Sequence, residues 1–280
     1  MSVEPGAIVD SHVHFWDPTR LEYPWLAELP VLHRPFLPTD LHAAMGELPV
    51  RRVVFVEANA RREQAIREAL FAADAPEVDG IVAFAALNEP AALRDRLDEL
   101  ALLPRVKGIR QNIQGNPPGF CLEAFFVEGV REVGRRGLTF DLCATHDQLT
   151  EVAELCRRCP DTRLVLDHCG KPAIAAGAWE PWASVIADIG SMEHVHCKLS
   201  GLLTEADLSG WTEDGLLPYA ERVAESFGSG RMMYGSDWPV LTLAGEYGAW
   251  YRFTRRVTRD WSGAETRAFY HDNAVSFYRL

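Results

Sequence analysis

The sequence predicts one α/β domain, a (β/α)8 TIM-type barrel over residues 1–280. Eight short runs rich in apolar and β-branched residues alternate with longer stretches of helical periodicity. Parallel strands need crossover connections, so this alternation predicts a parallel sheet. Eight repeats in 280 residues suit a closed barrel better than the alternative, an open doubly wound sheet.

The expected strands occupy residues 7–14, 53–58, 80–87, 105–110, 138–144, 163–169, 194–200 and 231–237. Helices are expected between them. One follows Pro90, a residue favoured in the first turn of a helix, and Gly or Pro follows several others. Residues 15–50 predict a long loop with a short helix, and residues 110–120 an irregular loop. No Pro/Gly/Ser-rich linker interrupts the chain, which predicts a single domain.

The composition narrows the classes of partner. Asp and Glu number 40 against 28 Lys and Arg, a formal charge of −12, which disfavours binding to a phosphate backbone. No signal peptide or apolar stretch of membrane-spanning length is visible. We therefore expect a cytoplasmic protein without nucleic-acid or membrane partners, its six cysteines reduced. The CxxC at Cys156–Cys159 is interpreted as a pair of ordinary helix residues.

Polar side chains gather where the expected strands end, which is where barrels of this kind place their active sites. The ends of six strands carry His12 and His14; Glu57 and Asn59; Arg110; Asp167 and His168; Lys198 and Ser200; Ser236 and Asp237. A barrel with a purely structural role would have no reason to collect such groups on one face.

Four of these residues are candidate ligands for a divalent ion, zinc above all. His12 and His14 stand two apart on a strand, so they project to the same side. His168 and Asp237 end two other strands and complete the set. Asp237 can also accept a proton from a water molecule. The alternative roles are packing for the histidines and a helix N-cap for Asp237.

Alternation along the strands assigns directions to other residues. Lys107 and Arg110 have opposite parity, and we expect Arg110 to face the site, where its guanidinium suits a substrate oxygen or carboxylate. Glu57 is a candidate ligand or hydrogen-bond acceptor, and Lys198 a candidate substrate contact. Asp167 should point away from His168 and is interpreted as structural.

A second pair, His194 and His196, begins the seventh expected strand. It therefore lies at the end of the barrel opposite the expected site, and it is interpreted as structural.

Three motifs carry a resemblance to a known family. HVH on the first strand, DHCGKP on the sixth and GSDWP on the eighth, in this order, resemble the amidohydrolase superfamily. VDSHVHFWDP, VKGIR and MYGSDWP are similar to its branch of sugar-lactone and pyrone-dicarboxylate lactonases, the L-fuconolactonase-like and L-rhamnonolactonase-like enzymes. The likeness spans residues 9 to about 275, nearly the whole chain.

The resemblance implies a hydrolase that opens a small polyhydroxylated sugar-acid lactone, an aldono-1,4- or 1,5-lactone, with an activated water. Asp237 would be the general base, and His168 would face the carbonyl or the metal. Trp16, Trp25 and Trp238 would offer aromatic faces to a sugar ring. Members of the branch differ in their need for a metal, so metal-free catalysis with imidazole, Arg or Lys donors is a second version.

Several alternatives stay open at this point. One is a zinc-dependent decarboxylase or a pyrone or amide hydrolase of the same superfamily. Another is a carbamylated Lys107 that bridges two metals. A third is a barrel that binds a metal or metabolite without turnover.

Overall fold

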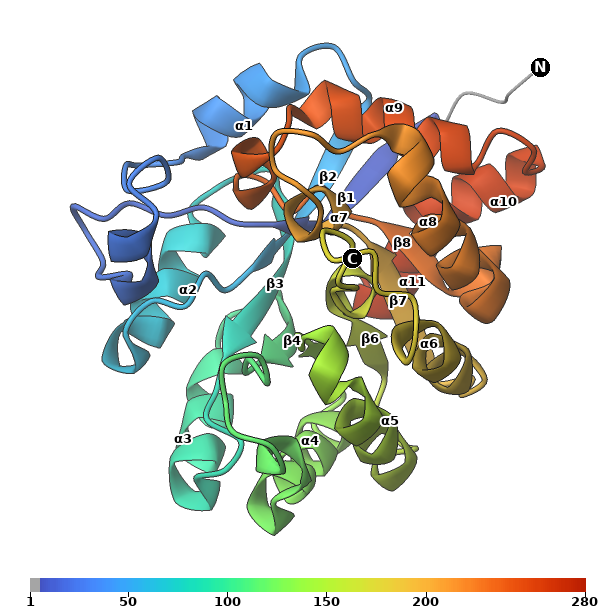
Figure 1. The fold of residues 1–280 in the computed structure, drawn as a ribbon. Helices are drawn as coiled ribbons and strands as arrows, with labels where there is room; N and C mark the ends of the chain where they lie inside the picture. Colours follow the sequence, from blue (N-terminus) through green and yellow to red (C-terminus); the bar gives the residue numbers. More distant parts are fainter. Residues whose placement is uncertain (1–5) are drawn as a thin grey trace.

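Eight parallel strands follow one another in chain order around a barrel in the computed structural model, which describes residues 6–280 (Figure 1). They are β1 (Ile8–Val13), β2 (Val50–Val56), β3 (Val78–Phe84), β4 (Val106–Arg110), β5 (Thr139–Leu142), β6 (Leu164–Leu166), β7 (Val195–Leu199) and β8 (Met232–Tyr234). The predicted (β/α)8 fold is confirmed. Residues 1–5 of the predicted domain lie outside the described residues.

The barrel closes between its first and last strands. Val13 forms a parallel bridge with Trp238. The backbone N–H of His14 donates to the carbonyl of Trp238 (2.8 Å), and that of Asp237 donates to the carbonyl of His12 (2.9 Å). These bonds join the carboxyl end of β1 to the segment after β8, so two of the expected site segments are hydrogen-bonded neighbours.

Helices surround the strands (Figure 1). They are α1 (Pro38–Met45), α2 (Ala65–Ala73), α3 (Pro90–Leu100), α4 (Ala124–Arg135), α5 (Leu149–Arg158), α6 (Trp182–Gly190), α7 (Leu202–Glu205), α8 (Glu213–Phe227), α9 (Tyr247–Val257), α10 (Gly263–Arg267) and α11 (Asn273–Tyr278). Their apolar stripes form the main core; α3, for example, buries Leu93, Leu97 and Leu100. Within residues 6–280, no helix combines the length and the apolar character needed to cross a membrane.

The last helix closes the amino-terminal end of the barrel. Phe277 and Tyr278 of α11 join a second buried cluster, formed with strand residues such as Val54 and Val165. The neighbouring Arg279 donates to the carbonyl of Gly137, just before β5. The aromatic C-terminus therefore forms the floor of the barrel, and the site lies at the other end.

Several strands are shorter than predicted, and in two of them the difference affects the candidate site. The sixth was expected over residues 163–169, but β6 ends at Leu166 and a helical turn follows over Asp167–Gly170. In this turn His168 and Cys169 have φ values of 53° and 55°. The eighth was expected over 231–237, but β8 ends at Tyr234. In both places the polar residues lie in the segment that follows the strand and not on the strand itself.

The two loops predicted from the sequence are present in the structure. Residues 15–50 contain a short 3-10 helix (Pro24–Glu28) and α1, and residues 110–120 are largely irregular. The last residues of the chain form α10, a π-helical segment (Ala268–Asp272) and α11. All six cysteines are free and buried.

Candidate active site

Two imidazoles and one carboxylate converge at the carboxyl end of the barrel. The Nε2 atoms of His12 and His14 lie 3.2 Å apart. Oδ1 of Asp237 lies 3.4 Å from Nε2 of His14 and 3.8 Å from Nε2 of His12. All three side chains are buried. The strand pair and the aspartate that follows β8 therefore meet at one point, as the sequence predicted.

The separations of these atoms fit a divalent cation. Zinc bonds of about 2.0–2.1 Å in a tetrahedral site place neighbouring ligand atoms roughly 3.3 Å apart. The observed 3.2, 3.4 and 3.8 Å lie around this value. His168 joins the group, because its ligand atom and those of His12 and Asp237 all lie within 4.8 Å of one another. The residues present can therefore hold one metal ion.

Each imidazole has a polar partner behind its ring, and in His14 this partner sets the tautomer. Nδ1 of His14 lies 2.7 Å from the carbonyl oxygen of Val56, so it must donate, which leaves the lone pair on Nε2. Nδ1 of His168 lies 2.9 Å from Oγ of Ser200. Nδ1 of His12 lies 3.1 Å from Nζ of Lys198 and 3.2 Å from Oδ1 of Asp167. Each histidine thus has a polar partner on its Nδ1, the arrangement usual for metal-binding imidazoles.

Burial sets the charge of these groups. It lowers the pKa of both His12 and His168 well below the ordinary value, so both are neutral near pH 7, as a metal ligand must be. Burial acts to raise the pKa of Asp237, but His168 and His14 outweigh it and the pKa is lowered. Asp237 is therefore a carboxylate that can bind a cation or accept a proton.

A layer of paired charges lies beneath the histidines. Arg110 bonds Glu57 through Nε (2.7 Å) and lies 3.3 Å from Asp167 through Nη1. Lys198 lies 2.5 Å from Oδ2 of Asp141 and 3.0 Å from Oδ1 of Asp167. These five residues are at most 3% exposed. Because unpaired charges are costly at such depth, this layer is a fixed support for the site.

Two segments of the site need unusual backbone. His168 and Asp237 have φ values of 53° and 61°, in the left-handed region. Gly201 faces His168, and a Cβ on this glycine would lie 2.6 Å from Nδ1 of the ring. Such conformations cost about 1–3 kcal/mol each and gather at functional sites.

Arg110, and not Lys107, reaches the histidines: Nη1 of Arg110 lies 3.5 Å from Nε2 of His12. Lys107 stands near the start of β4 and its Cγ lies close to Gly80, near the start of β3. A carbamylated Lys107 among the predicted ligands therefore does not fit this geometry.

The other predicted substrate contacts are buried. The indole N–H of Trp16 donates to the carbonyls of Leu32 and Arg34, and Trp238 packs against Phe15 and Phe36. Both indoles belong to the core, at 0% and 2% exposed.

The expectation that Asp167 points away from the site is wrong. Its carboxylate faces His12, Arg110 and Lys198. The alternation rule failed because β6 ends before Asp167, so the strand period no longer applies there. Asp141 was also missed, although a single acidic residue in the apolar run LTFDLCA was a signal for it.

A polar cleft of about 600 Å³ lies at the carboxyl ends of β2, β3 and β4. Most of its polar lining is carboxamide, from Asn59, Gln111, Asn112, Gln114 and Asn116. Asn59 follows Glu57 closely in the chain, and Gln111 follows Arg110. The cleft therefore borders the segments that carry the charged layer.

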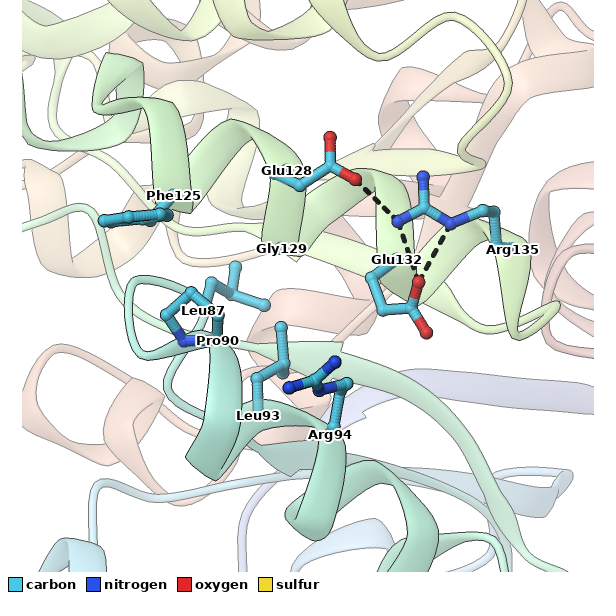
Figure 2. Close-up of a pocket in the computed structure, with 9 residues that line it drawn as sticks. All are labelled: Leu87, Pro90, Leu93, Arg94, Phe125, Glu128, Gly129, Glu132 and Arg135. Atoms are coloured by element: carbon cyan, nitrogen blue, oxygen red, sulfur yellow. Dashed lines mark hydrogen bonds and ion pairs between the residues drawn. The ribbon is translucent and has the colours of Figure 1, made fainter.

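A second hollow, of about 230 Å³, lies on the outer face between α3 and α4 (Figure 2). Its lining includes the exposed Phe125 and the ion pairs of Arg135 with Glu128 and Glu132. It contains none of the predicted site residues, so we do not connect it with the histidines.

Solved structures share this fold. An amidohydrolase from Burkholderia multivorans, crystallised with bound zinc, is 31% identical, with a TM-score of 0.90 over 98% of this chain and 99% of that chain. A putative 2-pyrone-4,6-dicarboxylic acid hydrolase from Pseudomonas putida has a TM-score of 0.77 over 99% and 98% of the two chains. At 19% identity, that second likeness concerns the fold alone.

The sequence has curated relatives along its whole length. The L-fucono-1,5-lactonase of Burkholderia ambifaria is 32% identical, over 97% of this chain and 95% of the relative. The family model described as amidohydrolase matches residues 9–280. The resemblance noted from the three motifs is thus confirmed, and the chain belongs to the amidohydrolase family.

Proposed function

We propose that this protein hydrolyses a small polyhydroxylated sugar-acid lactone with an activated water, assisted by one divalent metal ion, zinc. The observation that carries the proposal is the convergence of His12, His14 and Asp237 at separations of 3.2–3.8 Å in a buried site. The similarity to an L-fucono-1,5-lactonase over nearly the full length supports the choice of a lactone.

The metal would be held by His12 and His14, with His168 and Asp237 beside them. When bound, zinc supplies a Lewis acid for the lactone carbonyl and lowers the pKa of water. The depressed pKa of Asp237 keeps it ionised, so it can take the proton of the attacking water. Water adds to the acyl carbon, the ring C–O bond breaks, and Asp237 returns the proton to the departing alkoxide. The product is a hydroxy acid, which releases one proton near neutral pH.

The charged layer has a supporting part in this mechanism. Arg110, Glu57 and Lys198 were predicted to bind substrate, but their side chains are paired below the histidines. This burial favours a role in fixing His12 and Asp167. Direct contact of the three with a substrate stays a prediction, as it does for Trp16 and Trp238.

The polar cleft favours a neutral, hydroxyl-rich substrate. Carboxamides both donate and accept hydrogen bonds, which suits sugar hydroxyls. The two arginines of the cleft are already engaged, Arg61 with Glu22 and Arg62 with Glu89. A dicarboxylate would need cations that are not already paired. The ring of Trp25 also lines the cleft and offers an aromatic face.

The test is proton release from a panel of aldono-1,4- and 1,5-lactones, with the zinc content of the protein measured. We expect wild type and the surface control Asp161→Asn to release acid. The Asp237→Asn variant should be slower by about 10²–10⁴-fold, the usual contribution of a general base.

Three other outcomes of this test would contradict the proposed reaction or change its substrate class. Folded, zinc-loaded protein that opens none of the lactones would contradict the proposal. Turnover of a pyrone dicarboxylate alone would overturn the substrate class, and CO2 release from an aromatic acid would support the decarboxylase alternative.

A further inference from the structure

The C-terminal helix delivers a tyrosine hydroxyl into the barrel. Tyr278 of α11 is 1% exposed, and its hydroxyl donates to Oδ2 of Asp141 on β5 at 2.9 Å. The ammonium of Lys198 donates to the same oxygen at 2.5 Å. Figure 1 shows α11 close to β7 and β8, at the end of the chain. The last helix thus contacts the charged layer that supports the site.

Lys198 stands between this carboxylate and a metal-binding imidazole. Its Nζ lies 3.1 Å from Nδ1 of His12, at hydrogen-bond distance, and 3.0 Å from Oδ1 of Asp167, an atom that makes no aligned hydrogen bond among residues 6–280. If Nε2 of His12 binds a metal, the proton of the neutral ring is on Nδ1. A protonated Nδ1 cannot accept from an ammonium, so the protons of Lys198 must be directed to carboxylates.

Asp141 is the partner that holds Lys198 in this orientation. Both donors use its Oδ2, and among residues 6–280 its buried Oδ1 has no hydrogen-bond partner. The position of Oδ2 is therefore fixed by Lys198 from one side and by Tyr278 from the other. Burial raises the pKa of Asp141 to about 6, and the bonds from Lys198 and Tyr278 act against this rise. The hydroxyl thus also helps to keep the carboxylate charged.

We propose that Tyr278 is a positioning residue for His12: by fixing Asp141, it directs Lys198 to carboxylates and leaves the Nδ1–H of His12 to Asp167. Tyr278 acts through two intervening residues and does not touch the metal or the substrate. The inference rests on the metal-binding part of the proposed function and is independent of which lactone is cleaved.

A matched control lies in the same C-terminal segment. Tyr270 is 0% exposed, and its hydroxyl forms a 2.9 Å hydrogen bond with Oγ1 of Thr254. Tyr278→Phe and Tyr270→Phe therefore each remove one buried hydroxyl and one hydrogen bond to a side chain outside the metal-binding set. Both changes should cost stability, the first more because its hydrogen bond is to a carboxylate, but only the first affects the network below His12.

The experiment compares both variants with wild type in three measurements. These are the zinc dissociation constant by competition with a chelator, the thermal unfolding of metal-free protein, and the ¹⁵N resonances of the His12 ring in metal-free, histidine-labelled protein. For Tyr278→Phe we expect about tenfold weaker zinc binding, the lower range for loss of an outer-shell partner. We also expect a shift of the Nδ1 resonance. Tyr270→Phe should match wild type in both and share only the change in unfolding temperature.

The proposal is overturned if Tyr278→Phe lowers only the unfolding temperature, because the hydroxyl would then be a packing feature. If wild type itself binds no zinc, the proposed metal site fails, and the ring resonances decide this inference alone: an unchanged His12 signal overturns it. Asp141→Asn provides a second test, since it keeps the shape but removes the charge that holds Lys198. It should shift the same resonance at least as far.

Discussion

The tripeptide HVH occurs twice in this chain, and its two copies lie in different environments. His12 and His14 stand at the carboxyl end of β1, with their Nε2 atoms 3.2 Å apart beside Asp237. His194 and His196 stand at the amino end of β7. Nε2 of His194 donates to the carbonyl of Cys156 on α5 at 3.1 Å, and the ring of His196 packs on Phe277, 4.8 Å between centroids.

Position along the strand explains the difference. The carboxyl ends of the strands meet at the mouth of the barrel, where loops can carry ligands, whereas the amino ends meet the floor formed by α11. At the mouth, the first pair finds His168 and Asp237. The second pair is half-buried: His194 bonds to α5 outside the sheet, and His196 packs against the floor. A motif of two residues therefore has chemical meaning only together with its place in the fold.

The largest expected effect comes from replacing each histidine pair in turn. The double variant His12→Gln/His14→Gln should lose zinc and, with it, more than about 10³-fold in lactone hydrolysis, because a Lewis acid contributes several kcal/mol. The matched variant His194→Gln/His196→Gln should keep its zinc and most of its activity. Metal analysis and kcat/KM of both proteins check this. Equal losses of zinc and of kcat/KM in the two variants would mean that both histidine pairs act only through the stability of the fold.

A second prediction concerns acid stability. Burial, with Arg231 and Arg163 nearby, lowers the pKa of His196 to about 4 from 6.5. Below pH 6.5 the unfolded chain takes up a proton that the folded protein refuses until about pH 4, so stability falls as the pH falls. The loss over this window is about 3 kcal/mol.

Urea unfolding at a series of pH values measures this loss. His196→Gln should be less sensitive to acid than wild type between pH 6.5 and 4. If the two proteins lose stability in parallel, His196 is not the group responsible.

The smallest expected effect concerns His168, the third imidazole of the site, which lies after the end of β6 and not on a strand. His168 follows β6 in a left-handed turn, and its Nδ1 is 2.9 Å from Oγ of Ser200. Ser200→Ala should weaken zinc binding about tenfold, because an outer-shell hydrogen bond is lost. The exposed Ser191→Ala is the control. Unchanged affinity in Ser200→Ala would place His168 outside the metal site.

The sequence by itself determined the barrel and the grouping of the candidate metal ligands. Alternation of strands and helices is a local pattern, and the period of two along β1 directs His12 and His14 to one side. The rule that active sites lie at the carboxyl ends then selects His168 and Asp237. These conclusions need only short-range periodicity and the general properties of one fold.

Only the tertiary structure decided what lies beneath that set. Asp167 turns inward because β6 ends one residue before it, and left-handed residues follow. Tyr278 reaches Asp141 across 137 residues of sequence, and Lys198 reaches His12 across 186. Such contacts depend on how the barrel closes and on where its last helix packs. Local periodicity carries no information about either, so the pairing within the charged layer and its contact with Tyr278 were visible only in the folded chain.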